Sequence, residues 1–581
     1  MSDWVRLSPR PLPLASSTTS QDYPRRLIDV GLEDLDADVR LVEKSTRPSQ
    51  CVEYVALSYR WGTQNNLKTT KQTLGDHQKG IPLESLPKTL RDAVTLTRRL
   101  SIRYLWIDSI CIIQDDKVDW ATEAQHMGDI YMNSTLTIAA HAAEHADHGF
   151  LEQALARPKA TPVGGRRNGG SYDVERAAYI AFQQTVTDNA RKEGRGEDDQ
   201  TGPLDSDAFF VTESFNSHID LDNSELASRG WVLQERILSQ KTIHFCRNGA
   251  IYLETESGLL HINERQHGPR YQHESRSLRG ALSTFYSDRR EQNGWTASAS
   301  VGYNTSRKPH SELLASVRYD WYHLVAHYST CNLTEPRDKL VAISGIARKL
   351  QPILDNDKYY CGIWERHFYT NLLWLRRTAP LRRSTFSAKA RAPSWSWAAH
   401  DGAVQFPTWS HEGSDAVIKP ELRFGMVLNH ELPPSRDSIF DGWGMLELRD
   451  AVRIGTGLRF LGAETGKPQW QLVVNSVALG HQTRYWGVAS DAGDYIGWAA
   501  LDWEERAEVD GQMERITCFK VASFTNDRPE TGFKRGFMVL FVKLVNPALG
   551  IFGRVGMGQI MDASLFDERD LSTRYERLML V

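Results

Sequence analysis

Strand-like and helix-like segments alternate along residues 51–152, and this alternation constrains the fold more than any other feature of the sequence. The strand-like runs are short and apolar, as in buried parallel strands, and comprise residues 51–59, 104–113 and 134–142. Residues 86–102 have the apolar spacing of an amphipathic helix, and residues 119–133 predict a second helix with Asp119 as its N-cap. We therefore expect an α/β fold built on a doubly wound parallel sheet.

The composition of the remaining chain predicts further parts. Residues 1–50 form a Pro/Ser-rich N-terminal extension that is expected to add a short hairpin. A domain over residues 51–265 is interrupted at about 155–222 by a Gly-rich and charged insertion. Residues 266–425 predict a mostly helical, Trp-rich middle region, and residues 426–581 predict a β-rich accessory domain.

Three shorter segments sharpen this division. Within the first domain, residues 228–240 predict a helix, and residues 241–254 predict two strands around a turn at Asn248-Gly249. In the accessory domain, the glycines at 553–558 do not match G-x-G-x-x-G, and we expect them to mark a β turn.

Composition and charge exclude several classes of protein. The chain has 69 basic and 73 acidic residues, a net charge of −4 that predicts neither a nucleic acid nor an anionic membrane as partner. Its six cysteines are far apart and form no CxxC pair, which is typical of reduced thiols. No signal-peptide core and no apolar run long enough to span a membrane is present, so we expect a cytoplasmic protein without a membrane span.

Four separated motifs resemble, in residues, order and spacing, the fungal heterokaryon incompatibility (HET) domain family. They are Tyr54–Gly62, Leu105–Gln114, Met127–Tyr131 leading into Leu136–Ala140, and Arg229–Arg236. Segments that resemble the region following such domains come later, at 338–346, 362–364 and 393–397. The resemblance therefore covers most of the chain.

The resemblance implies a fold and a chemistry. HET domains are thought to be related to Toll/interleukin-receptor-type (TIR) domains, so it implies a flavodoxin/TIR-like sheet. Ser58, Tyr59 and Arg60 end the first strand as a TIR first strand does. Trp231 precedes Glu235 by four positions, which is similar to the Trp and the glutamate of the TIR members that cleave NAD.

Ligands of open α/β sheets bind beyond the carboxyl ends of the strands, where two of these motifs end. The residues that we expect to contact a nucleotide are Ser58, Tyr59, Arg60, Trp61, Gly62, Asp108, Arg229 and Trp231. The carboxylate of Glu235 could hold the ribose hydroxyls and stabilise the positive charge that develops when the nicotinamide–ribose bond breaks. Trp61 or Tyr59 could stack on a base, and Arg60 or Arg229 could pair with the pyrophosphate.

Each of these residues also has a structural alternative. Glu235 could be a helix-surface charge or a partner of Arg229 or Lys241. Asp108 could cap the turn that follows it. Trp61 and Trp231 could be core anchors without a ligand.

Two further candidates have stronger structural alternatives. Glu123 is a candidate second acid, although for it we favour a capping or solvated role. Cys111, between two isoleucines, is expected to be a buried and inert thiol.

One pattern is typical of a metal site. His141, Glu144 and His145 have the H-x-x-E-H spacing of some zinc enzymes, with His148 nearby. The stretch follows a predicted strand and the resemblance places it in a loop, so we expect no metal site. No phosphate-binding G-x-x-x-x-G-K-[ST] loop is present either, and we expect no cofactor, with NAD as a candidate substrate.

Three hypotheses of function remain open. In the first, the HET domain self-associates on activation into a homo-oligomer and triggers regulated cell death as a non-self response, after sensing a protein partner that the sequence does not identify. In the second, the associated domain also hydrolyses NAD, with Glu235 as the key carboxylate. In the third, the domain is a catalytically inactive interaction scaffold.

Overall fold

The computed structural model describes most of the chain in twenty-one stretches. These are residues 24–34, 36–46, 52–62, 67–152, 161–163, 209–211, 218–255, 258–261, 278–282, 310–377, 382–383, 391–406, 416–420, 423–428, 445–453, 459–465, 484–489, 495–502, 516–526, 535–561 and 575–580. The predicted insertion at 155–222 lies largely outside them. Within it the structure describes a strand pair, β6 (Thr161–Val163) and β7 (Phe209–Val211), and the π-helical segment η3 (His218–Asp222).

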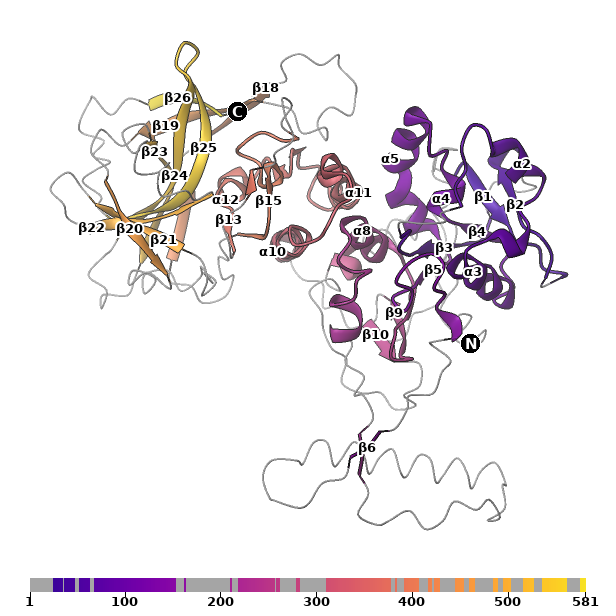
Figure 1. The fold of residues 1–581 in the computed structure, drawn as a ribbon. Coiled ribbons are helices and arrows are strands. Elements are labelled where there is room, and N and C mark those ends of the chain that lie inside the picture. The colour runs from indigo at the N-terminus through magenta and orange to yellow at the C-terminus, as the bar shows by residue number, and fades with distance from the viewer. Residues whose placement is uncertain are drawn as a thin grey trace.

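An eight-stranded mixed sheet organises the N-terminal part (Figure 1), in the order β10-β9-β8-β5-β3-β4-β1-β2. The strands are β1 (Arg26–Asp29), β2 (Arg40–Glu43), β3 (Tyr54–Ser58), β4 (Tyr104–Trp106), β5 (Leu136–Ala139), β8 (Thr242–Phe245), β9 (Ile251–Thr255) and β10 (Gly258–His261). The four central strands, β4-β3-β5-β8, are parallel. Antiparallel strands complete both edges, so the sheet is mixed where the sequence predicted a parallel one.

The strand order creates a switch point. From β3 the chain passes to β4 on one side, and from β4 it returns to β5 on the other side of β3. Crossovers that leave a strand in opposite directions open a crevice beyond the carboxyl ends of that strand and its neighbour, here β3 and β5. The residues that directly follow these two strands are therefore the ones that a ligand would meet first.

Helices connect these strands. They are η1 (Lys44–Thr46), α2 (Leu74–Lys79), η2 (Leu83–Ser85), α3 (Lys88–Arg99), α4 (Asp108–Cys111), α5 (Lys117–Asn133) and α8 (Gly230–Leu238). Helix α3 forms where the apolar spacing predicted it, and its buried face includes Leu90, Ala93 and Val94. The prediction of Asp119 as N-cap is wrong, because Asp116 caps α5 by accepting from the backbone N–H groups of Val118 and Asp119.

The second predicted strand is shorter than its apolar run suggested. Strand β4 ends at Trp106, and residues 108–111 form the single helical turn α4. Arg26 donates a 2.7 Å hydrogen bond to the carbonyl of Cys111 at the end of this turn, and Thr69 Oγ1 donates to the carbonyl of Ile110. Side chains that are distant in the sequence therefore donate hydrogen bonds to backbone carbonyls that would have bonded to a neighbouring strand if β4 had continued.

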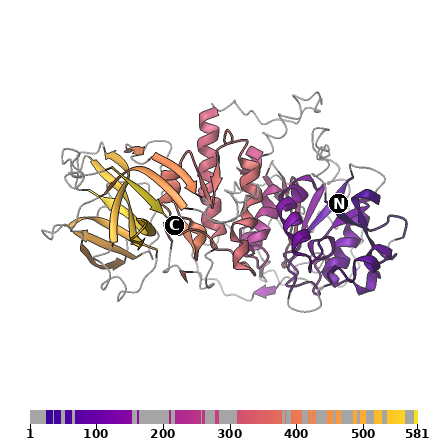
Figure 2. The ribbon, with the colours of Figure 1, turned by 90° about the horizontal axis from the view of Figure 1, so that it is seen from above.

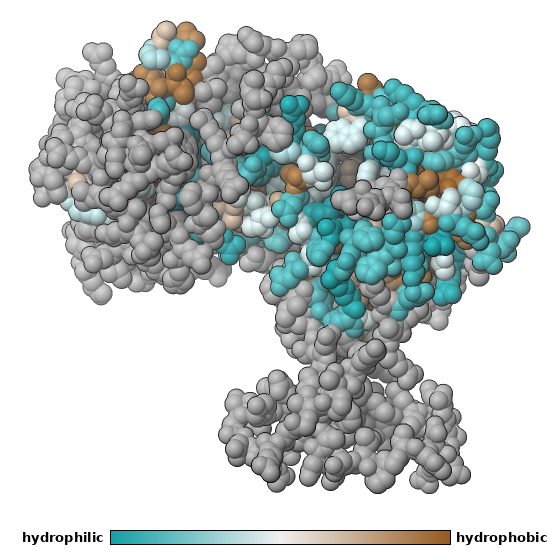
Figure 3. Space-filling model, in the orientation of Figure 1, coloured by the Kyte–Doolittle hydropathy of each residue, from teal (hydrophilic) through white to brown (hydrophobic). Residues whose placement is uncertain are grey.

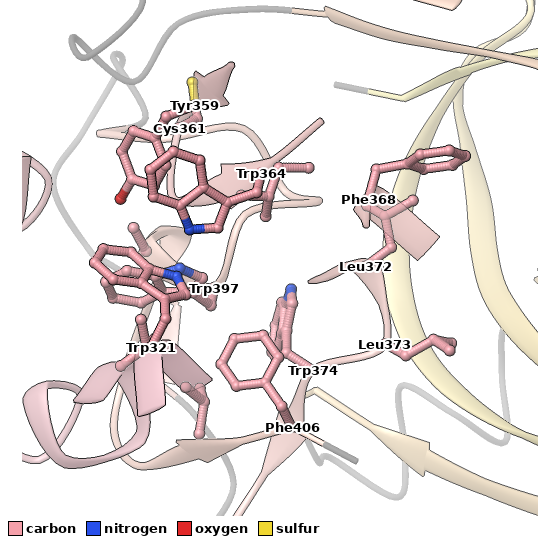
Figure 4. Packing of buried hydrophobic residues seen from close by; sticks show 14 of the residues in the cluster. Trp321, Tyr359, Cys361, Trp364, Phe368, Leu372, Leu373, Trp374, Trp397 and Phe406 are labelled. Atoms are coloured by element: carbon pink, nitrogen blue, oxygen red, sulfur yellow. The ribbon is translucent and has the colours of Figure 1, made fainter. Parts of the chain in front are cut away.

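The middle region combines helices with two-residue strands. Its elements are α10 (His310–Tyr328), η4 (Pro336–Lys339), α11 (Val341–Leu350), β11 (Tyr359–Tyr360), β12 (Ile363–Trp364), α12 (Phe368–Leu372), β13 (Leu375–Arg376), β14 (Arg382–Arg383), η5 (Trp397–Ala399), β15 (His400–Asp401) and β16 (Val404–Gln405). Five fully buried indoles of the described residues lie in its core, namely Trp321, Trp364, Trp374, Trp395 and Trp397, and Figure 4 labels four of them. The indole N–H groups of Trp374 and Trp397 donate to backbone carbonyls, whereas those of Trp321, Trp364 and Trp395 find no partner.

The C-terminal part is β-rich, as the sequence predicted. Its ten strands are β17 (Ala416–Pro420), β18 (Arg423–Leu428), β19 (Met445–Arg453), β20 (Arg459–Thr465), β21 (Arg484–Ala489), β22 (Tyr495–Leu501), β23 (Ile516–Asn526), β24 (Arg535–Asn546), β25 (Ile551–Ile560) and β26 (Tyr575–Leu580). All belong to one sheet, which is antiparallel except where β25 meets β26. Exposed apolar residues Leu544, Val545 and Leu549 lie at the tip of the β24–β25 hairpin (Figure 3).

The middle region lies between the two sheets in both views (Figures 1 and 2). Helices α5, α8 and α11 pack against one another at the junction with the N-terminal part. None of the helices in the described part of the chain has the length and apolarity needed to cross a bilayer.

Candidate functional site

The first two motifs meet at the carboxyl edge of the central strands. Ser58 is the last residue of β3, and Asp108 begins α4, two residues after the neighbouring parallel strand β4 ends at Trp106. Trp61 Nε1 donates to Asp108 Oδ2 at 2.8 Å, and the Tyr59 hydroxyl donates to Ser109 Oγ at 2.9 Å. Parallel pairing of β3 with β4 therefore places the loop after one strand directly against the loop after the other.

Helix α8 adds a cation and a carboxylate to this edge. Arg229, its N-cap, donates a 2.6 Å hydrogen bond to the backbone carbonyl of Tyr59. Glu235, nearly two turns later, has a side chain beside the hydroxyl groups of Ser58 and Tyr131. The structure thus brings together the expected residues of motifs that are far apart in the sequence.

Glu235 is buried and incompletely hydrogen-bonded. The residue is 7% exposed, and its Oε2 atom makes no hydrogen bond; the Oγ atom of Ser58, which is 2% exposed, makes none either. The Tyr131 hydroxyl donates to the carbonyl of Leu57 at 3.0 Å. A buried carboxylate with unused acceptor capacity is costly for folding and is typical of functional sites.

Burial dominates the electrostatics of both acids in this site. It raises the pKa of Glu235 to about 7, although the Ser58 hydroxyl and the positive charge of Arg229 act in the opposite direction. Burial also raises the pKa of Asp108, against the effects of Arg229 and the Trp61 indole. Near neutral pH Glu235 therefore exists in both protonation states, the range in which acid–base groups work well.

The remaining residues of the first motif have mainly structural contacts. Arg60 forms an ion pair with Glu225. Gly62 has a φ of +79°, and a Cβ atom added there would lie 2.7 Å from the Cβ of His145. The loop after β3 therefore requires glycine for its backbone conformation and for its close approach to the loop after β5.

Trp231 and Asp108 both make contacts that fit a structural role, as a core anchor and as a cap of the following turn. The Trp231 indole N–H donates to Asp338 Oδ2 at 3.2 Å, and its ring packs edge-on against Trp120. Trp231 therefore links α8 to the middle region, as a core anchor would. Asp108 Oδ1 accepts from the backbone N–H of Ser109, a local capping contact, while Oδ2 binds Trp61.

Glu123 belongs to a different cluster, and its expected capping or solvated role is wrong. It is 2% exposed, and its Oε1 atom lies 3.8 Å from Arg26 NH2. Arg26 also pairs with Asp119, the neighbour of Glu123 on α5. Burial raises the pKa of Glu123 to about 7, and no interaction found for its carboxylate reaches Glu235.

Two other expectations concern reactive or metal-binding groups. Cys111 is fully buried, and burial raises the pKa of its thiol to about 12, so it is unreactive as predicted. His141 contacts His244, whereas the ring of His145 stacks on that of His148 with centroids 5.6 Å apart. The spaced histidines therefore do not converge, and within the described residues no group of three or more metal-binding side chains is found.

Tyr131 is the site residue that the sequence reasoning missed. It lies fully buried on α5, and its ring meets that of Trp106 edge-on at 5.6 Å. A signal was present, since Tyr131 closes the third motif, but residues 119–133 were interpreted only as a helix that carries part of a family motif. Its hydroxyl faces Glu235 because α5 packs directly against α8.

Comparison with known proteins bears on this region of the chain. The sequence model of the family described as heterokaryon incompatibility protein (HET) matches residues 54–235. The chain carries a HET domain. The match begins with the first residue of β3 and ends at Glu235, so the HET domain encloses every candidate site residue.

One curated relative also matches part of the chain. Heterokaryon incompatibility protein 6, OR allele, from Neurospora crassa is 38% identical over 88 residues. These residues make up 14% of this chain and 13% of the relative, so the similarity spans a small part of either protein. No solved structure matches the chain.

Proposed function

We propose that this protein is a heterokaryon-incompatibility-type signalling protein that triggers regulated cell death as a non-self response. In this proposal the HET domain is flavodoxin/TIR-like, self-associates on activation, and cleaves NAD with Glu235 as the key carboxylate. The HET domain and the partial similarity to an incompatibility protein support the signalling role. The central strand order β4-β3-β5-β8, second-first-third-fourth along the chain, begins the flavodoxin-like order and supports the fold assignment.

The observation that carries the enzymatic part is the buried Glu235 carboxylate beside Ser58, at the carboxyl end of β3. Hydrolysis of NAD breaks the bond between ribose C1′ and the nicotinamide nitrogen, and the bonding electrons leave with nicotinamide. Water then adds to C1′ and loses a proton, giving ADP-ribose. The ionised Glu235 would stabilise the positive charge at the ribose, and Arg229 would attract the pyrophosphate.

The burial of Glu235 also supports activation by self-association. At 7% exposure the carboxylate is not open to a nucleotide in the isolated chain. Access would require α8 or the loop after β3 to shift, and contact with a second copy is the trigger that we propose. The same burial favours the alternative in which the domain is an inactive scaffold that only assembles.

A nicotinamide-release assay on the full chain tests the enzymatic proposal. Concentrated wild-type protein, alone and fused to an oligomerising tag, is incubated with NAD, and nicotinamide is measured by chromatography. We expect Glu235→Gln to reduce the rate by a factor of about 100 or more, the effect of removing a group that stabilises transition-state charge. Glu123→Gln is the matched control, because it removes an equally buried carboxylate from the other cluster.

The outcomes separate the hypotheses. Equal loss in both variants would assign the effect to folding, and loss only in Glu123→Gln would move the site to α5. If the tagged oligomers do not cleave NAD, the enzymatic proposal is wrong and the inactive-scaffold hypothesis is favoured. Self-association is measured separately by light scattering, and cell death by scoring viability of fungal cells that express either variant.

A further inference from the structure

A second chain of polar groups lies at the same edge of the sheet, outside the candidate NAD site. Ser224 Oγ lies 2.7 Å from His141 Nδ1, and His141 Nε2 lies 2.9 Å from His244 Nδ1. His244 Nε2 in turn lies 3.1 Å from Glu254 Oε2. Four side chains from four separate segments are therefore connected end to end.

Arginines fix the charge at the inner end of this chain. Arg236 Nε donates to Glu254 at 2.9 Å, and Arg279 NH2 lies 3.5 Å from the same carboxylate. Burial alone would raise the pKa of Glu254, but these arginines and His244 hold it well below its usual value. Glu254 is thus an ionised acceptor.

The ionised carboxylate sets the direction of every hydrogen bond in the chain. Burial lowers the pKa of both His141 and His244, so each ring is neutral and carries one proton. His244 must donate from Nε2 to Glu254, which leaves its Nδ1 as an acceptor. His141 must then donate from Nε2 to His244, so its Nδ1 is an acceptor that faces the Ser224 hydroxyl. The carbonyl of Leu221, 2.8 Å from the same Oγ, is a second acceptor for the single proton of this hydroxyl.

The outer end of the chain reaches the surface, whereas the inner end does not. His244 is fully buried and His141 is 6% exposed, but Ser224 is half-buried. A hydroxyl that donates to a histidine, which is itself held by a second group, is the arrangement that activates a nucleophile. The Ser224 Oγ also accepts from the backbone N–H of Ala227, which fixes its position in the turn.

We propose that Ser224 is a nucleophile, activated by the relay His141–His244–Glu254, in a second site that takes an uncharged carboxylic ester. The charges near Ser224 support this substrate class. Glu225, the next residue, pairs with Arg60 and Arg247, and Arg247 also pairs with Glu144. Two cations and two anions leave no net charge to select an ionic substrate.

The reaction conserves atoms and charge. Ser224 Oγ attacks the ester carbonyl carbon while its proton moves to His141 Nδ1. The negative charges of Glu254 and Asp222 stabilise the imidazolium, against the opposing charge of Arg236. The carbon–oxygen bond to the leaving alcohol then breaks, and the alcohol takes the proton from His141. Water, deprotonated by the same nitrogen, hydrolyses the acyl-serine and releases a carboxylic acid.

Covalent labelling of the full chain tests the proposal. The protein is treated with a fluorophosphonate, which reacts with activated serines, and the labelled peptide is identified by mass spectrometry. Turnover of p-nitrophenyl acetate is followed in parallel. We expect one label on Ser224, formed at least about 100 times faster in the folded protein than in urea, in keeping with base activation of a serine.

Three variants control the experiment. Ser224→Ala should abolish the label, and His141→Gln should slow it by at least tenfold while its amide can still accept from the serine hydroxyl. Ser228→Ala is the matched control, because both hydroxyls donate to the carbonyl three residues earlier in the same turn, but only that of Ser224 also contacts His141. Because burial holds the pKa of His141 well below its ordinary value of 6.5, the rate for Ser224 should rise with pH only in the acid range below that value and then level off, which a serine with only a structural role would not show.

Several results would overturn the proposal. These are no label on folded protein that has a native circular dichroism spectrum, equal labelling in urea, and a rate unchanged in His141→Gln. The test is independent of NAD cleavage: Glu235→Gln should keep the serine label, and Ser224→Ala should keep any nicotinamide release.

Discussion

Two glutamates on neighbouring helices are each buried, and burial raises the pKa of each to about 7. Their surroundings differ. Arg26 lies 3.8 Å from Glu123, whereas Glu235 has hydroxyl groups as its nearest polar neighbours and the cation Arg229 near the site. Each carboxylate keeps one oxygen without a hydrogen bond, Oε1 in Glu123 and Oε2 in Glu235, so the two acids differ in the charges around them and not in unused acceptor capacity.

The raised pKa of Glu235 predicts a pH dependence of stability. Between its ordinary value of 4.5 and about 7 the folded chain binds the proton more tightly than the unfolded chain does. The contribution of Glu235 to the free energy of unfolding is therefore fully present below about pH 4.5. It is lost as the pH rises through about 7, and the loss is roughly 3 kcal/mol at most. Glu235→Gln should flatten this decline in urea-unfolding measurements from about pH 5 to about pH 8. A decline as steep as that of wild type would contradict the assigned pKa.

Gly62 predicts a second residue-scale effect. Gly62→Ala should destabilise the chain by about 1–3 kcal/mol, because it combines a positive φ with a clash against His145. Gly31→Ala is the control, since Gly31 has a φ of +67° but nothing within 4 Å of an added Cβ. Thermal unfolding should show the larger loss for Gly62, and equal losses would mean that the two loops do not need their close contact.

Strand ends and the family resemblance were enough to find Ser58, Asp108 and Glu235 from the sequence. They could not reveal the surroundings of Glu123, because Arg26 comes from the N-terminal extension and meets α5 only through the sheet. They also could not find the Ser224 relay, whose members lie on four segments without a shared motif. Residue type and spacing predict local structure, whereas these two clusters form only when segments that are distant in the sequence pack together.

At the scale of elements, α5, α8 and α11 approach closely through small residues. A Cβ atom added to Gly345 in α11 would lie 2.2 Å from Gln234 Oε1 in α8. One added to Gly128 in α5 would lie 3.4 Å from the Cα of Gly345. Neither polar atom of the buried Gln234 amide has a partner, so this side chain fills the junction by shape alone.

Gly345→Ala tests this junction. We expect a loss of about 1–3 kcal/mol in urea unfolding, because the added methyl overpacks a buried interface and the Gln234 amide must move. Gly75→Ala in α2 is the matched control: it also lies in a helix, and nothing is within 4 Å of its added Cβ. That control should be neutral or stabilising by up to about 1 kcal/mol, as alanine favours helices. A Gly345 variant as stable as the control would mean that the helices can separate without cost.

Elements were easier to predict than their ends. The period of apolar residues found α3, because burial of one face dominates helix formation, and α5 and α8 form within residues 119–133 and 228–240, where helices were predicted. The prediction of a β turn at 553–558 is wrong, since these residues lie within β25. Cβ atoms at Gly556 and Gly558 would come within 2.3 Å and 2.1 Å of carbonyl oxygens on β22. Close approach of a second strand, which no local pattern encodes, explains these glycines.

At the scale of the whole molecule, one arginine ties the β-rich part to the middle region. Arg554 on β25 is 1% exposed and donates to Asp502 at 2.9 Å and 3.1 Å. It also donates to the carbonyls of Leu372 and Trp374, and its guanidinium lies 3.6 Å from the ring centroid of Trp374. A single side chain therefore satisfies groups on both sides of the boundary.

Arg554→Met should consequently destabilise the full chain by about 3–5 kcal/mol, because it leaves Asp502 buried without its cation. The double variant Arg554→Met/Asp502→Asn should recover part of this loss, since it removes the unpaired charge. Both are compared with wild type by urea unfolding, monitored through tryptophan fluorescence. A double variant less stable than the single one would show that the carbonyl contacts, not the charge pair, dominate.

Helix α8 has contacts on three sides: Glu235 faces the ends of the central strands, Arg236 holds Glu254, and Trp231 binds Asp338 of the middle region. A rigid helix of nine residues cannot shift at one of these points without shifting at the others. Any event that displaces the middle region would thus shift two chemically distinct groups, Glu235 and Glu254, at once. Coupling of this kind would allow the binding of a partner elsewhere on the molecule to control the HET domain without direct contact between the partner and that domain.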